Sequence, residues 1–423
     1  MSFQQGLSGL NAAAKNLDTI GNNVANANTV GFKGSQAQFA DVYANAQGGS
    51  TGSAIGIGVK VAAVAQQFGQ GGVTSTGNPL DMAISGQGFF QLENNGAIAY
   101  SRNGQFQMDK NGYIVNAQGH KLSGYPVNPL TGIIATGSTG ALQLPTGAIS
   151  PMPTTTSQVG LNLDSRAIVP PTLGFNPTDP TSYNNSTALT IYDSLGNNHI
   201  ATLYFQKAVA PVNTWNAYMT VDNLPTDGVA TVPPSGTSLG TLTFSSTGLL
   251  TAPVGPPLGR ISVPAGGVVY ANGSTTPQPM TMDFSSSTQF GAVFGVTTLN
   301  QNGYTSGQLN GFSTSSDGTI VGRYTNGQSQ ALGQILLVNF TNPQGLQPLG
   351  KNEWSSTSAS GQPLSGVPGS SSLGILQSGA TEDSNVDLTA ELVNMITAQR
   401  VYQANAQTIK AQDTIMQTIT NLR

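Results

Sequence analysis

The stretch that decides the fold is residues 384–423, which read SNVDLTAELVNMITAQRVYQANAQTIKAQDTIMQTITNLR. Apolar residues recur in it every seven positions, at Leu388, Met395, Tyr402, Ile409 and Met416, and Leu392 lies beside this row. A seven-residue apolar period is typical of a coiled-coil helix. Ser384 and Asp387 have the spacing of a capping box, so we expect the helix to begin there. A helix this long needs a partner to cover its apolar face.

The first residues of the chain predict that partner. Leu10, Leu17 and Val24 form one heptad row, and Leu7 and Ile20 widen the apolar face. Ser2 and Gln5 have the spacing of a capping box. A run of asparagines over residues 22–28, followed by Thr-Val-Gly, favours turns, so we expect this helix to end near residues 25–28. Two apolar seams at opposite ends can pair only if the chain between them leaves and returns to one place.

Composition narrows the function classes. Only 8% of the 423 residues are charged, the net charge is −4, and the 14 Lys and Arg residues are scattered. Without a basic patch we expect no nucleic-acid partner. No apolar run approaches the 18 or more residues of a membrane span, so we expect no membrane insertion. Cysteine is absent, which excludes disulfides and thiolate chemistry. The first residues lack the basic and apolar regions of a cleaved signal peptide.

The region between the helices is predicted to be β-rich. Short alternating segments between residues 78 and 125 are punctuated by Asn95-Gly96, Asn103-Gly104 and Asn111-Gly112, two of which are strong hairpin signals. A second β-rich block covers residues 151–303, where proline-rich connections exclude long helices. The β rhythm of the first block resumes at residue 304, and Trp354 is expected in its core.

The predicted domains are therefore nested: the two terminal helices enclose the first β domain in the sequence, and the first β domain encloses the second. We predict an α+β, mainly β chain, with paired terminal coiled-coil helices and two nested β-rich domains. The predicted divisions are residues 1–30 with 384–423 for the helices, 31–72 with 360–383 for an extended connector, 73–150 with 304–359 for the first β domain, and 151–303 for the inserted one.

Candidate chemical residues are few. His120 and His199 each follow a turn, and a Ser-His-Asp site stays open because sequence cannot show which side chains meet. The four glutamates leave a glycosidase pair open in the same way. The loop Asp193-Ser194-Leu195-Gly196-Asn197-Asn198 lacks the closing Glu of an EF-hand and favours a hairpin turn over calcium. We predict no cofactor, no metal and no enzyme activity.

Several stretches resemble bacterial flagellar rod and hook proteins. They are residues 7–33 (LSGLNAAAKNLDTIGNNVANANTVGFK), the quoted tail, residues 79–90 (PLDMAISGQGFF) and residues 102–122. Residues 189–205 (LTIYDSLGNNHIATLYF) and 301–340 are similar to hook members of this family in particular. The resemblance covers both ends and the first β domain, and the inserted domain only in patches.

The resemblance implies a function by assembly. It implies a helical tubular homo-oligomer, the curved and flexible hook, which couples the torque of the motor and rod to the filament outside the cell. It implies as partners the rod and hook–filament junction proteins, the hook cap and the export apparatus, which needs no cleaved signal. The subunit interface would then involve Leu7, Leu10, Leu17, Ile20, Val24, Leu388, Leu392, Met395, Tyr402, Ile409 and Met416.

Three alternatives remain open from the sequence. A distal rod-type protein would share both ends but usually lacks an inserted domain of this size. A secreted β-rich protein that binds or hydrolyses carbohydrate would be a stable monomer. A fibre or adhesin would also be β-rich and low in charge, but would not need matching helices at its two ends.

Overall fold

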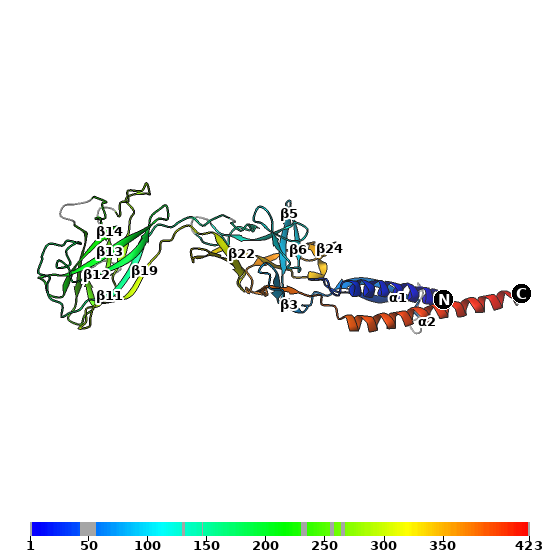
Figure 1. Ribbon diagram of the computed structural model, residues 1–423. Coiled ribbons are helices and arrows are strands. Elements are labelled where there is room, and N and C mark those ends of the chain that lie inside the picture. Colours follow the sequence, from blue (N-terminus) through cyan, green and yellow to red (C-terminus); the bar gives the residue numbers. More distant parts are fainter. Residues whose placement is uncertain are drawn as a thin grey trace. The chain divides into compact units, whose positions relative to one another are not determined.

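The protein is mainly β with two long helices that pack together, which confirms the expected fold class. The computed structural model describes residues 2–42, 56–128, 132–145, 147–229, 235–253, 258–263 and 267–421. The helices are α1 (Ser2–Ala25) and α2 (Leu388–Asn421), and they lie side by side in Figure 1. The glycine-rich loop at residues 47–53, which the sequence marks as part of the connector, lies outside the described residues.

The chain forms two compact units. The first contains residues 1–146, 310–323 and 329–423, and the second contains residues 147–309 and 324–328. The chain therefore enters the second unit from the first and returns to it. The finer division of the first unit into helices, connector and β domain, and the boundaries at residues 150 and 303, stay proposals.

The cap of α2 differs from the sequence expectation. The helix begins at Leu388, and its N-cap is Asp387, whose Oδ1 accepts the backbone N–H of Thr389 at 2.9 Å and of Ala390 at 3.1 Å. The hydroxyl of Ser384 accepts only the N–H of Val386, at 3.3 Å. Asp387 is the capping residue because it directly precedes the helix, where one carboxylate oxygen accepts two of the backbone N–H groups that have no partner within the helix.

The start of α1 involves a contact that the sequence did not predict. Gln5 donates a hydrogen bond through Nε2 to the carbonyl of Gly56, before β2, at 2.6 Å. The capping box expected between Ser2 and Gln5 stays a prediction, because the side chain of Ser2 lies outside the described residues. The predicted end is correct, since α1 ends at Ala25 and the N–H of Asn26 still bonds to Asn22.

In its described residues, the first unit is built from one large antiparallel sheet and three strand pairs. The sheet follows the order β20-β21-β22-β9-β5-β6-β25-β24, with further short strands at its side. These strands are β20 (Leu309–Thr314), β21 (Thr319–Tyr324), β22 (Ser329–Ile335), β9 (Lys121–Pro126), β5 (Phe89–Asn94), β6 (Ala97–Ser101), β25 (Glu353–Ser355) and β24 (Gln347–Gly350). The short ones are β7 (Gln107–Met108), β8 (Ile114–Val115), β10 (Gly140–Ala141), β23 (Leu337–Asn339) and β26 (Leu364–Gly366), and a 3₁₀ turn covers Pro343–Gly345.

The three pairs connect the sheet to the helices. They are β1 (Ser35–Val42) with β2 (Gly58–Gln66), β3 (Val73–Ser75) with β28 (Ala380–Glu382), and β4 (Met82–Ser85) with β27 (Ile375–Ser378). In the last two pairs, a strand from the N-terminal part of the chain pairs with a strand that lies shortly before α2. The segments that follow α1 and precede α2 therefore lie side by side.

Aromatic side chains fill the core of the large sheet. Trp354 is 2% exposed, and its ring lies 5.8 Å from Phe89 and 5.6 Å from Phe68, edge to face. Its Nε1 donates to Oε1 of Gln66 at 2.6 Å. Such edge-to-face pairs add to the burial energy, so Trp354 fills the core position expected from the sequence.

The predicted asparagine–glycine turns differ from one another. Asn95 (φ 49°) and Gly96 (φ 88°) join β5 and β6, with positive φ at both central residues as a type I′ turn requires. Asn103-Gly104 is not such a turn. A Cβ on Gly104 would collide with the backbone of Met82, so glycine is needed there because two backbone segments of the chain lie very close together.

Over the ranges that the structure describes, the second unit is a sandwich of two sheets. One has the order β17-β18-β11-β19 and the other β12-β13-β14-β15-β16. The strands of the first sheet are β11 (Thr156–Asn162), β17 (Arg260–Ser262), β18 (Thr281–Asp283) and β19 (Gly295–Gln301). Those of the second are β12 (Asn185–Tyr192), β13 (Asn198–Lys207), β14 (Thr214–Val221), β15 (Thr237–Phe244) and β16 (Leu250–Ala252). Side chains from both sheets form one buried cluster around Trp215, Phe205 and Phe284, which is why the faces pack together.

Candidate functional site

The helix pair is antiparallel and closely packed. Gly6 lies against Ile409, Gly9 against Asn405, and Asn23 against Glu391, so positions rise along α1 while they fall along α2. A Cβ on Gly9 would lie 2.6 Å from Oδ1 of Asn405. The glycines of α1 therefore allow the two helices to approach closely.

The heptad row of α2 lies beside the surface that faces α1. Ala398, which is 4% exposed, belongs to that facing surface together with Glu391 and Asn405. In contrast, Leu388 is 45% exposed and Leu392 is 44% exposed. Of the other predicted interface residues of α2, Met395 and Ile409 are half-buried, and Tyr402 and Met416 are exposed.

The predicted residues of α1 are more covered. Ile20 is buried, Leu10, Leu17 and Val24 are half-buried, and Leu7 is exposed. The structure thus brings Ile20 of α1 and Ile409 of α2 into the helix pair. It leaves Leu388, Leu392, Tyr402 and Met416 of α2 at the surface. Their assignment to contacts between copies stays a prediction.

A groove runs between the helices and the β1–β2 hairpin. Its volume is about 830 Å³, and its apolar lining includes Ala12 and Ile20 of α1, Phe39 and Val59 of the hairpin, and Val401 of α2. The lining also contains polar residues such as Asn16, Gln67 and Asn394. Clefts of this size are typical of binding sites on proteins.

Asn23 of α1 forms hydrogen bonds to both β1 and α2 at one end of this groove. Its side chain is 2% exposed; Nδ2 donates to the carbonyl of Ser35 at 2.7 Å and to Oε1 of Glu391 at 2.9 Å, and Oδ1 accepts the N–H of Ser35 at 2.8 Å. From the sequence Asn23 is only a residue that ends a helix. The signal that could have marked it is its position on the same face as Ile20, three residues away.

A buried ionic cluster lies next to the helix ends. Oε1 of Glu382 is 2.6 Å from Nζ of Lys33, and Oε2 is 3.0 Å from Nη1 of Arg102. The N–H of Gly71 also donates to Oε1 of Glu382, at 3.0 Å. The cluster joins the segment after α1, the segment after β2, the end of β6 and the strand before α2.

The electrostatics of this cluster are governed by burial. The side chains of Lys33 and Glu382 are fully buried, and that of Arg102 is 4% exposed. Burial lowers the pKa of Lys33 and of Arg102, and the negative charge of Glu382 acts against both changes. A buried cation that keeps its anion is held in one geometry, so the cluster fixes the path of the chain into both helices.

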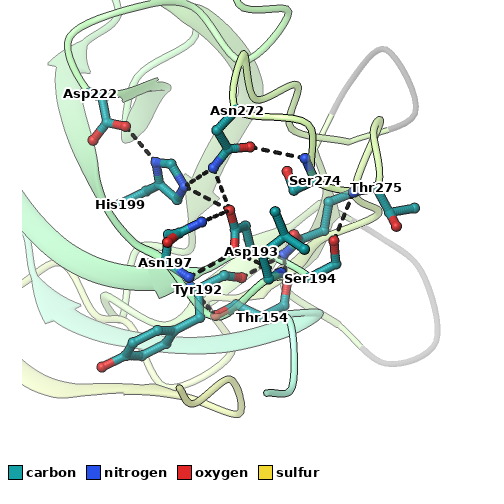
Figure 2. A network of polar contacts seen from close by, with 12 residues as sticks. Thr154, Tyr192, Asp193, Ser194, Asn197, His199, Asp222, Asn272, Ser274 and Thr275 are labelled. Atoms are coloured by element: carbon teal, nitrogen blue, oxygen red, sulfur yellow. Dashed lines mark hydrogen bonds and ion pairs between the residues drawn. The ribbon is translucent and has the colours of Figure 1, made fainter. Parts of the chain in front are cut away.

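A second polar network lies in the sandwich unit, at the turn between β12 and β13 (Figure 2). Asp193 is fully buried, and its carboxylate accepts the N–H of Leu195 at 2.9 Å, the N–H of Asn197 at 2.8 Å and Nδ2 of Asn272 at 2.5 Å. Burial alone would raise the pKa of Asp193. The hydrogen bonds from Asn197, Asn272 and His199 outweigh it and lower the pKa to about 2.

His199 lies between two carboxylates in this network. Its Nδ1 is 2.6 Å from Oδ2 of Asp222 and its Nε2 is 3.4 Å from Oδ2 of Asp193. The ring stacks on Tyr270 at 4.3 Å, and burial raises the pKa of that tyrosine. The hairpin turn expected at Asp193 is confirmed, but the sequence did not reveal that a loop near residue 272 and Asp222 would close around it.

The two histidines and two of the glutamates make specific contacts. His120 bonds to Glu353 at 2.8 Å, and among the described residues neither histidine has a hydrogen bond to a serine hydroxyl. Glu353 and Glu382, two of the four glutamates, are buried and paired with basic side chains. In the ranges that the structure describes, no three His, Cys, Asp or Glu residues are grouped to hold a metal ion. Neither helix is apolar enough over a sufficient length to cross a bilayer.

Four family models match along the chain. They are described as flagella basal body rod protein (residues 3–33), flagellar hook protein FlgE/F/G D1 domain (83–161), flagellar basal body protein FlaE D2 domain (162–304) and flagellar basal body rod FlgEFG protein C-terminal (377–422). The nested β units, the paired end helices and these matches define an axial structural protein of the bacterial flagellum.

Relatives along the whole chain give the particular family. The flagellar hook protein FlgE of Salmonella typhimurium is 45% identical and that of Escherichia coli is 43% identical, with each chain covered completely. The chain belongs to the flagellar hook protein FlgE family. The hook protein of Treponema pallidum is also similar, at 32% identity over all of this chain and 99% of its own length.

A solved structure supports the fold. The crystal structure of the Helicobacter pylori flagellar hook protein FlgE2 superposes with a TM-score of 0.52 at 12% identity, over 72% of this chain and 99% of that one. The family models and the full-length relatives confirm the resemblance to the rod and hook proteins noted in the sequence, and the chain is a structural protein of the flagellar hook.

Proposed function

We propose that copies of this chain polymerise into the hook tube through the apolar surfaces that α1 and α2 leave exposed. The observation that carries the proposal is the exposure of large apolar side chains on a paired helix. On α2, Leu388, Leu392, Val393, Ile396 and Ile415 are each 44–59% exposed. A helix that is already paired and still exposes such residues on its other sides has room for further helices.

The energy of assembly follows from this exposure. Each large apolar side chain removed from water contributes roughly 1.5–3 kcal/mol, and every copy adds the same set. The low charge of the chain, 32 charged residues of 423 (14 basic and 18 acidic), leaves little electrostatic repulsion between copies. The role is structural, and we propose that the protein has no catalytic activity.

The remaining partners follow from the position of a hook. We propose contacts with the rod at one end, with the hook–filament junction proteins and the hook cap at the other, and export through the flagellar secretion apparatus without a cleaved signal. A rod-type role is the second candidate. It is disfavoured because the relatives that match along the entire chain carry the hook name.

Bending of the tube requires segments that change length or direction at low cost. The proposed segments are the glycine-rich parts of the connector, near residues 47–72 and 355–380. Gly48-Gly49 lies outside the described residues, whereas Gly361 has φ of 79°, where glycine is the residue of choice. Replacing Gly361 by a rigid residue is expected to straighten hooks or impair motility, and normal motility would contradict this assignment.

Electron microscopy of the purified chain tests the main proposal. Full-length protein at high concentration should form tubes, and a chain that ends at residue 387 should stay dispersed. Circular dichroism of the shortened chain should retain the β signal, which excludes global unfolding as the cause. A shortened chain that still forms normal tubes would contradict the proposal.

A further inference from the structure

One end of α2 extends past its partner helix. Gly6 lies against Ile409, and α1 begins only four residues before Gly6, whereas α2 continues to Asn421, twelve residues beyond Ile409. At a rise of about 1.5 Å per residue, α2 projects roughly 12 Å further than α1. All residues at positions 413–418 are exposed, and Ile415 is 51% exposed. We call residues 413–418 the projecting segment.

The groove between α1, α2 and the β1–β2 hairpin lies nearer the other end of the helix pair. Its lining includes the small residues Ala12 and Ala13 of α1 and Ala398 of α2, together with Phe39 of the hairpin. Small residues at a helix surface allow another helix to approach closely, as the glycines of α1 do toward α2. The groove, with a volume of about 830 Å³, therefore offers space for side chains of an additional helix.

The projecting segment and the groove cannot meet within one copy. Ile415 lies seventeen residues from Ala398 on one continuous helix, which is about 25 Å along its axis. A second copy displaced along this axis can bring its own Ile415 to the groove of the first. A contact between two different surfaces of identical chains generates an open helical filament when the rotation between copies does not close a ring.

Charge agrees with this pairing. The charged residues that line the groove are both acidic, Asp387 and Glu391. At the base of the projecting segment α2 carries the exposed Lys410, and the acidic residue of the segment, Asp413, accepts a hydrogen bond from Gln417 at 3.1 Å. Lys410 of one copy can therefore approach the acidic end of the groove of another.

We infer that the projecting end of α2 in one copy docks into the groove between α1, α2 and the β1–β2 hairpin of the next copy. The inference rests on the proposed polymerisation and names the two surfaces that carry it. Ile415 is the apolar anchor, and Phe39 is the edge residue that it contacts.

Cysteine cross-linking tests the contact directly, because the natural chain contains no cysteine. The double variant Phe39→Cys with Ile415→Cys is assembled and then oxidised. Both positions are exposed in the single chain, at 41% and 51%, so the substitutions should not disturb folding. We expect a ladder of covalent oligomers in a denaturing gel. Neither single variant should give one, and neither should Ile98→Cys with Ile415→Cys, which pairs the segment with an exposed residue of the large sheet.

A second measurement follows polymerisation itself. Ile415→Asp should raise the protein concentration needed for tube formation about tenfold or more, since an apolar contact is lost from every copy, and Ile415→Leu should restore it. Tubes that form without a Phe39–Ile415 ladder would overturn the inference and leave the proposed function intact. A cross-link confined to single chains would also overturn it. Failure of the unmodified chain to form tubes would remove the proposed function and the inference with it.

Discussion

Nζ of Lys33 lies 2.6 Å from Oε1 of Glu382, although 349 residues separate them in the chain. Lys33 follows α1 by eight residues, and Glu382 precedes α2 by six. This buried pair, with Arg102 on the other carboxylate oxygen, fixes where both helices leave the β strands. The cluster therefore fixes the positions of the two helix ends relative to each other within one chain.

Removing the charge of Glu382 should strongly destabilise the first unit. Glu382→Gln leaves Lys33 and Arg102 buried without their anion, and breaking a buried ion pair on one side costs about 3–5 kcal/mol. The free energy of unfolding in urea measures this loss. Asp18→Asn, which breaks the exposed pair of Asp18 with Lys15, should change it by less than about 1 kcal/mol. Equal effects of both variants would show that burial does not decide the energy of the pair.

The sandwich unit should lose stability in acid through Asp193. The pKa of this carboxyl is lowered from 3.8 to about 2, so it contributes stability above its ordinary pKa, roughly 2 kcal/mol, which is lost as pH falls from about 4 through 2. Asp193→Asn should be less stable at neutral pH and should lack this part of the pH dependence.

The two tryptophans allow the measurement in the full chain. Trp215 is buried in the sandwich core and Trp354 in the other unit. A Trp354→Phe background therefore makes tryptophan fluorescence report the sandwich alone. If Asp193→Asn in this background kept the slope of stability between pH 4 and pH 2, another group would be responsible.

An acidic residue on the exposed face of α2 should prevent assembly without unfolding the chain. Leu392 is 44% exposed, so Leu392→Asp should leave the thermal unfolding of the dispersed protein nearly unchanged. In a polymer the added carboxylate would be buried among apolar side chains, which is costly. Sedimentation should find Leu392→Asp in the soluble fraction and the conservative Leu392→Met in tubes. Normal pelleting of Leu392→Asp would exclude Leu392 from the interface.

Asn23→Ala should loosen the helix pair at the end near the strands. The substitution leaves the N–H and carbonyl of Ser35 and the carboxylate of Glu391 without their partner, at a cost of about 1–3 kcal/mol. Amide hydrogen exchange should become faster around residues 388–394. The exposed neighbour Asn22→Ala is the matched control, and equal exchange in both variants would refute a fastening role for Asn23.

The sequence by itself determined the helices, the β character between them and the family. The heptad rows and the asparagine run set the extent of α1 and, within three residues, the start of α2, because apolar period and turn residues are local properties. Asn95-Gly96 likewise set its hairpin, since the positive φ of its turn is a property of two adjacent residues.

Only the tertiary structure decided which side chains meet. Local rules placed the whole heptad row of α2 at the helix seam, but close approach at Gly6 and Gly9 brings only Ile409 of that row, with Asn405, against these glycines. Leu388 and Leu392 stay exposed. The clusters around Glu382 and Asp193 join residues far apart in the chain. No local period can reveal such contacts, because the energy of a buried charge depends on partners that only folding brings within reach.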